Sequence, residues 1–163
     1  MSTRVYVPTS AALLRQVVTS DGVGPAPFVA HAVTDRLRTA WADASDEEWE
    51  YAASATGAQA SLGLLTEADA PRRLVLALDV ATVTPVDGDD PTMVEVAQAV
   101  PFRRIAAVLA DDADAEDAVA AARDAFLAAE QGDDAAERVV ERCLDHELGW
   151  WATQEIGHLL EVL

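Results

Sequence analysis

Short runs of aliphatic and β-branched residues alternate along the chain with longer segments of helical periodicity. Five runs predict strands, and they cover residues 4–7, 28–33, 74–80, 92–97 and 105–110. Residues 74–80 are almost continuous Leu, Val and Ala, which is typical of a strand covered on both faces. Residues 92–97 alternate between apolar and polar side chains, which indicates an edge strand.

Helix starts are predicted by polar residues that can cap a first turn. Thr9 or Ser10 can cap a helix that runs to about residue 18, and Thr34 begins a short second helix. Ser45 and Glu48 have the spacing of a capping box, in which each side chain accepts a hydrogen bond from the other residue's backbone amide. The helix that they begin is expected to run to about residue 67.

The last third of the chain predicts two more helical segments. Asp111, Asp112 and Asp114 are expected to cap a helix that runs to about residue 131 and ends at Gly132. Asp134 begins a final helical segment that runs toward residue 163.

The order β-α-β-α-α-β-β-β-α-α predicts an α/β (or α+β) fold. We expect a mixed, partly parallel sheet of about five strands packed against helices. A length of 163 residues suits a single domain over residues 1–163. Hydrophobic residues make up 51% of the chain, so it can bury a core despite its charge.

The chain is strongly acidic, and this restricts its partners. Asp and Glu number 29 against 11 basic residues, all of them arginine, for a net charge of -18. Such a surface repels phosphate backbones and anionic lipids, so nucleic-acid and membrane binding are not expected. A protein partner remains possible, and a basic protein or a cation is electrostatically allowed; the oligomeric state is left open.

Cysteine use and hydropathy suggest a reducing compartment. Cys143 is the single cysteine and is expected to be an inert core residue. No apolar run approaches the ~20 residues of a membrane span, and the N-terminus lacks the apolar region of a signal peptide. We therefore expect a cytoplasmic protein.

Several short motifs occur together across the chain. They are RVYVP at residues 4–8, GPAP at 24–27, AVT at 32–34, EYAA at 50–53, APRR at 70–73 and HELGWWATQE at 146–155. Together they resemble a small family of uncharacterised actinobacterial proteins that forms a domain of unknown function of about this length. The resemblance implies a GC-rich bacterial source rather than a halophile, and it implies no activity, cofactor or partner.

The most unusual segment lies near the C-terminus, where histidine, tryptophan and carboxylate side chains gather. Six residues form a candidate ligand or partner patch: His146, Glu147, Trp150, Trp151, Gln154 and Glu155. On a continuous helix the two tryptophans point about 100° apart, so one is expected to pack on the sheet. The alternative is that the segment is only a lid on the core.

Metal and cofactor sites are not predicted. Glu155 and His158 have the Glu-x-x-His spacing of di-iron bundles, but the chain has no second copy. Asp112, Asp114 and Glu116 alternate as in a calcium loop, which here lacks its glycine and its final glutamate. Helix capping is the favoured interpretation of these acidic residues.

Two arginine pairs are candidate anion contacts, namely Arg72 with Arg73 and Arg103 with Arg104. If their strands are neighbours, the guanidinium groups could bind a carboxylate or phosphate bidentately. The alternative is that they pair with surface carboxylates or guard strand ends.

The sequence contains no nucleotide-binding or nucleophile motif, and no catalytic residue is predicted. His31 lies within a predicted strand and is expected to be a packed residue. We favour a non-enzymatic interaction or regulatory module, and whether the protein is an enzyme stays open. The alternative is a small enzyme or ligand-binding protein with a pocket near the C-terminal His/Glu/Trp segment.

Overall fold

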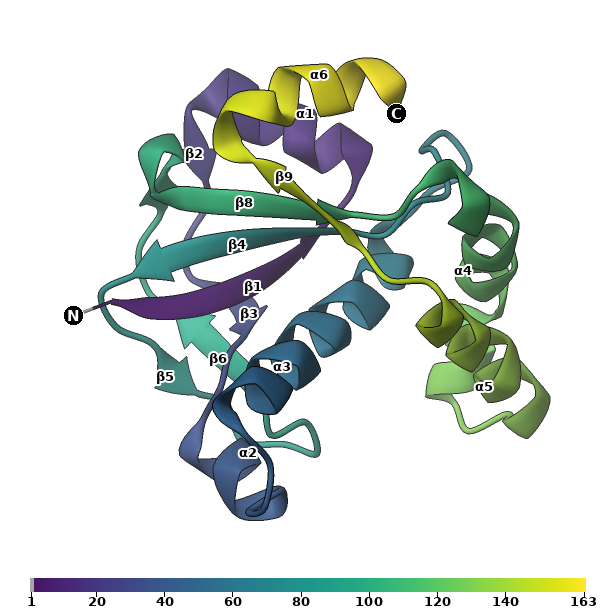
Figure 1. Cartoon of the computed structure of the whole chain (residues 1–163), viewed down its shortest axis with the longest axis horizontal. Helices are drawn as coiled ribbons and strands as arrows, with labels where there is room; N and C mark the ends of the chain where they lie inside the picture. The colour runs from purple at the N-terminus through teal and green to yellow at the C-terminus, as the bar shows by residue number, and fades with distance from the viewer. Residues whose placement is uncertain (1) are drawn as a thin grey trace.

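A seven-stranded sheet is the centre of the computed structural model, which describes residues 2–163. The strand order is β5-β6-β3-β1-β4-β8-β9 (Figure 1). These strands are β1 (Thr3–Thr9), β3 (Phe28–His31), β4 (Leu74–Val80), β5 (Thr84–Pro85), β6 (Met93–Val96), β8 (Ile105–Ala110) and β9 (Gly149–Ala152). A separate two-stranded sheet pairs β2 (Gly22–Val23) with β7 (Val100–Pro101).

The predicted α/β class is confirmed, and all five predicted strands are present. The expectation of partly parallel pairing is wrong, because every strand pair within residues 2–163 is antiparallel. Helices between strands were expected to act as crossover connections, which place neighbouring strands parallel. Here the neighbouring strands run in opposite directions. The additional strands β2, β5, β7 and β9 have two to four residues each, too few for a clear alternating pattern. Since β5 pairs with β6, residues 92–97 do not form the edge as predicted.

Six α-helices surround the sheet in the described chain. They are α1 (Ala11–Ser20), α2 (Asp35–Ala40), α3 (Asp46–Ser61), α4 (Glu116–Glu130), α5 (Asp134–Glu141) and α6 (Ile156–Val162). The predicted caps of the first three helices are present, since Ser10, Thr34 and Ser45 each accept a backbone amide. Gly132 follows α4 with a φ of 89°, a left-handed conformation that favours glycine.

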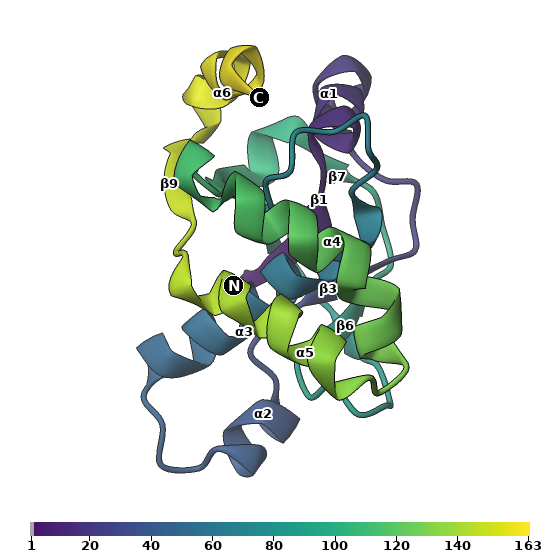
Figure 2. The same cartoon turned by 90° about the vertical axis from the view of Figure 1, so that its right-hand side faces the viewer.

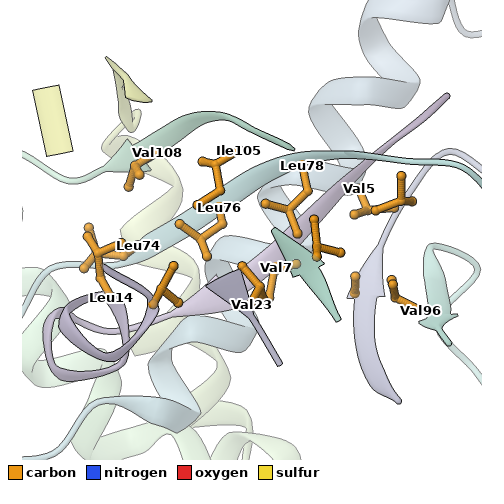
Figure 3. Packing of buried hydrophobic residues seen from close by; sticks show 14 of the residues in the cluster. Val5, Val7, Leu14, Val23, Leu74, Leu76, Leu78, Val96, Ile105 and Val108 are labelled. Atoms are coloured by element: carbon orange, nitrogen blue, oxygen red, sulfur yellow. The ribbon is translucent and has the colours of Figure 1, made fainter. Parts of the chain in front are cut away.

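The alternation of side chains along each strand divides the core between the two faces of the sheet. Leu74, Leu76 and Leu78 of β4 pack in the larger cluster, together with residues of α1 and α6. Figure 3 shows this cluster from close by. Val75 and Ala77 point the other way and contact α3. The sheet is therefore covered by α1 and α6 on one face and by α3 on the other (Figures 1 and 2).

Helices α4 and α5 form a hairpin with a smaller core of its own beside the end of α3. Val119, Val140 and Cys143 lie in this core with Leu62, from the turn that follows α3. Cys143 is buried as predicted, and its burial raises the pKa of the thiol above its usual range. None of the helices in residues 2–163 combines the length and apolar character that a membrane span requires.

Candidate functional site

The C-terminal segment contains a strand where a helix was expected. A 3₁₀ helix (Arg142–Asp145) is followed by β9, which pairs with β8 so that Trp150 lies opposite Leu109 and Trp151 opposite Val108. The predicted helical segment is wrong at residues 149–152, because the edge of β8 offers backbone partners that a helix could not use. Tryptophan also suits a half-buried strand surface.

The strand places the two tryptophans on opposite faces of the sheet. Trp151 packs against the larger core, and its ring centroid lies 6.0 Å from that of His158. Trp150 faces the α3 side and remains 58% exposed. Gln154 and Glu155 are exposed beyond the strand, where Glu155 accepts the Ala152 amide at 2.8 Å. The six predicted patch residues therefore do not form one surface.

Three of the six, His146, Glu147 and Trp150, line a cleft of about 360 Å³ on the α3 side of the sheet. Residues of α3 line the same cleft from across it, with Tyr6 of β1 and Arg73 before β4 also in its lining. The polar and aromatic side chains that line it are Tyr6, Glu50, Tyr51, Ser54, Arg73, His146, Glu147 and Trp150.

A buried ion pair supports one end of the cleft. Arg73 donates from Nε and Nη2 to the two carboxylate oxygens of Asp111, each at 2.8 Å, and its side chain is only 5% exposed. Its Nη2 also donates to the His146 carbonyl at 2.9 Å. Burial opposes the charged form of Arg73, but the bonds and charge of Asp111 outweigh it and raise the pKa. The pair therefore fixes the chain that carries His146 to the ends of β4 and β8.

A tyrosine orients one of the cleft carboxylates. The Tyr6 hydroxyl donates to Glu50 Oε2 at 2.6 Å. Burial and this bond to Glu50 raise the pKa of Tyr6 well above its ordinary value, so the phenol remains a neutral donor.

The uncompensated charge of the cleft is negative. Arg73 is the one arginine among its described lining residues, and Asp111 neutralises its charge. The carboxylates of Glu50 and Glu147 remain, next to two exposed aromatic side chains, Tyr51 and Trp150, each 58% exposed. An aromatic, carboxylate-bearing cleft has the chemistry that attracts a cation.

The two arginine pairs lie far apart. Leu74 is opposite Ala110 and Leu78 is opposite Ile105, so the antiparallel register puts the pairs at opposite ends of β4 and β8. At ~3.3 Å per residue this separates them by roughly 20 Å. Arg72 pairs with Glu116 at 3.3 Å and Arg73 with Asp111. Arg103 and Arg104 are exposed and line a different groove.

The capping role predicted for the aspartates after β8 is wrong. Neither Asp112 nor Ala115, the residues that precede the 3₁₀ turn and α4, makes a side-chain cap bond. Asp111 accepts from Arg73 instead, because a buried guanidinium without a carboxylate would be very costly. No three His, Cys, Asp or Glu side chains in residues 2–163 are grouped so that they could hold a metal ion.

His31 is buried, as predicted, and lies outside the cleft. Its Nδ1 is 2.9 Å from Thr92 Oγ1 and 3.3 Å from an Asp90 carboxylate oxygen. A larger hollow of about 830 Å³ lies between α1 and the two-stranded sheet, lined mainly by apolar side chains that indicate no particular ligand.

The α3 side of the cleft was not found from the sequence, although a signal was present. Glu50, Tyr51 and Ser54 follow a capping box at helical spacing, which places them on one side of α3. These three residues form one wall of a cleft only because β9 supplies the opposite wall.

The fold and site define an acidic α/β protein with an antiparallel sheet and an aromatic, carboxylate-bearing cleft. The chain belongs to the Family of unknown function (DUF6912), whose model matches residues 3–160. This confirms the resemblance to a domain of unknown function. Comparisons with curated proteins and with solved structures give no match.

Proposed function

We propose that the protein is a non-enzymatic interaction module that binds a lysine or arginine side chain of a partner protein in the cleft between α3 and β9. The observation that carries this proposal is the pairing of Tyr51 and Trp150, each 58% exposed, with the carboxylates of Glu50 and Glu147 in one cleft. A cation over an aromatic ring gains ~0.5–1 kcal/mol at an exposed site and ~2 when it is desolvated.

The charge of the whole chain supports the same partner. A net charge of -18 attracts basic protein segments from a distance and repels nucleic acids and anionic membranes.

The proposal includes one domain over residues 1–163 in the cytoplasm of an actinobacterium. The buried, unpaired Cys143 supports this compartment.

A small organic cation is the second candidate for the same cleft. A volume of about 360 Å³ falls within the range of small-molecule sites. His146 and Glu147 would then act as binding groups, and no catalytic role is assigned to them.

The test is a titration followed by NMR of the tryptophan indole N–H groups. The probes are a short peptide with two lysines separated by glycines, an equivalent peptide with two glutamates, and choline. We expect the lysine peptide to shift the Trp150 signal with saturation, and the glutamate peptide to leave it unchanged. Choline binding as tight as that of the lysine peptide would favour the small-molecule candidate.

Matched variants give the proposal its control. Trp150→Ala and Glu147→Gln should each weaken binding about fivefold, because each removes one attraction to the cation. Binding by all variants is measured by isothermal calorimetry, since Trp150→Ala lacks the Trp150 signal. Trp41→Ala and Glu130→Gln change exposed residues outside the cleft and should bind like the original protein. Equal weakening by both sets, or no binding of either cation, would overturn the proposal.

A further inference from the structure

A second hollow, of about 780 Å³, lies at the other end of the sheet from the cleft. Arg103 and Arg104 line it from the 3₁₀ helix Phe102–Arg104 that precedes β8. Ser2, Thr82 and Gln98 contribute further polar side chains to the lining. In Figure 1 this end of β4 and β8 is the one near the N-terminus, away from α4 and α5.

Arg103 and Arg104 are two of the six arginines that have no carboxylate within ion-pair distance in residues 2–163, and they are the two of these six that are adjacent in the sequence. Arg4, Arg38, Arg72, Arg73 and Arg123 each pair with a carboxylate. Within residues 2–163, neither Arg103 nor Arg104 lies within ion-pair distance of one. A chain with 29 acidic residues therefore leaves two adjacent guanidinium groups free beside one groove.

Asp79 is the one carboxylate among the described residues that line the groove, and it does not cancel these charges. Asp79 accepts from Arg4 Nε at 2.8 Å and from Arg4 Nη2 at 3.3 Å. The hydrogen bond to Asp79 is the main cause that raises the pKa of Arg4, and the opposite charges of this ion pair offset each other. The groove thus holds two uncompensated positive charges.

We infer that this groove binds a small dianion, a phosphate or a dicarboxylate, through Arg103 and Arg104. Each planar guanidinium can donate two parallel hydrogen bonds to a carboxylate or phosphate, and two of them match two negative charges. A polyanion such as nucleic acid is excluded, because all but a few of its charges would face the acidic remainder of the surface. Thr82 and Gln98 add neutral polar groups that suit the same ligand.

The test is a titration of the full chain with inorganic phosphate and with succinate, each against sodium chloride at equal ionic strength. Binding is followed by isothermal calorimetry and by the Nε–H signals of the two arginines. We expect saturable binding of one or both dianions and none of chloride. The stronger of the two shows whether the natural ligand is a phosphate or a dicarboxylate.

Three variants decide whether the groove is responsible. Arg103→Gln and Arg104→Gln should each weaken binding about tenfold, since each removes a charge-assisted contact. Arg138→Gln, on the exposed surface of α5, should bind like the original protein. Absence of saturable binding, or equal weakening by all three variants, would overturn the inference. Circular dichroism establishes that each variant is folded.

The groove and the cleft are tested independently. Trp150→Ala should leave phosphate or succinate binding intact, and the Arg103 and Arg104 variants should leave the lysine peptide bound. Loss of dianion binding in Trp150→Ala would contradict a separate anion site.

Discussion

At the scale of single residues, two polar clusters connect distant parts of the chain. Arg73 and Asp111 join the start of β4 to the end of β8, and their side chains are 5% and 0% exposed. His31, Thr92 and Asp90 connect β3 to the loop before β6. Both clusters contain charges that interact outside bulk water, so both predict measurable effects on stability.

Removing one member of the buried pair should be strongly destabilising. We expect Arg73→Ala or Asp111→Ala to lower the free energy of unfolding by about 3–5 kcal/mol, because a buried charge loses its partner. Urea denaturation measures this effect. The double variant Arg73→Met with Asp111→Leu should be more stable than either single variant, and a double variant that is less stable than both would contradict the explanation.

Asp90 should make the free energy of unfolding depend on pH in the acid range. Burial opposes its ionisation, but hydrogen bonds from His31 and Thr92 outweigh burial and lower the pKa of Asp90 to about 2. Because the pKa of Asp90 is lower in the folded state than its unfolded value of 3.8, the ionised carboxylate stabilises the fold at pH values above 3.8. This stabilisation is lost as the pH falls toward 2. Asp90→Asn should therefore flatten the fall in unfolding free energy over this range, whereas Asp43→Asn, on an exposed turn, should not.

At the scale of elements, the strand conformation of β9 determines on which face of the sheet each tryptophan lies. Trp151 packs against the core with α6, and Trp150 lies in the cleft wall. Successive side chains point to opposite faces in a strand, whereas in a helix they would point only about 100° apart. The same dipeptide therefore stabilises the fold with one residue and forms the candidate site with the other.

The two tryptophans should differ in their contribution to stability. Trp151→Ala should cost about 2–3 kcal/mol of unfolding free energy through lost packing, and Trp150→Ala about 0.5 kcal/mol or less. Urea denaturation of the two variants makes the comparison. Equal costs would contradict the assignment of Trp151 to the core side and Trp150 to the cleft.

At the scale of the whole molecule, charge is the dominant feature. A net charge of -18 is spread over 163 residues, and Arg103 and Arg104 place two positive charges side by side in one groove at one end of the sheet. Repulsion between like charges destabilises a compact state, and salt screens it over ~10 Å at 0.1 M. The overall charge therefore affects stability as well as the choice of partner.

Salt should accordingly stabilise the folded protein and weaken the binding of the lysine peptide in the cleft. The thermal midpoint should rise as sodium chloride increases from about 0.01 M to 0.5 M, because the Debye length falls across this range. Binding of the lysine peptide should weaken over the same range. A midpoint that does not respond to salt would show that self-repulsion is negligible in this fold.

Much of the fold was predictable because it depends on neighbours in the chain. The Ser45 capping box needs only residues three apart, and the apolar run of β4 identifies a buried strand without reference to any partner. Fold class and family membership followed from such local signals, as did the boundaries of β4 and β8.

Half of the candidate site could not be predicted, since its geometry depends on residues far apart in the sequence. His146, Glu147 and Trp150 were identified by their chemistry, but Glu50 and Tyr51 join them only through the packing of α3 beneath the sheet. The partner of Arg73 was also missed, since Asp111 lies 38 residues away.

By itself, the sequence determined where the first three helices and the five predicted strands begin, how acidic the chain is, and which residue types are available for binding. Only the tertiary structure decided that the strands pair antiparallel, that residues 149–152 join the edge of β8, and that the arginine pairs lie at opposite ends of the sheet. The physical reason is that caps and periodicity act within a few residues. Strand pairing and ion pairing depend instead on which distant groups are brought together when the core excludes water.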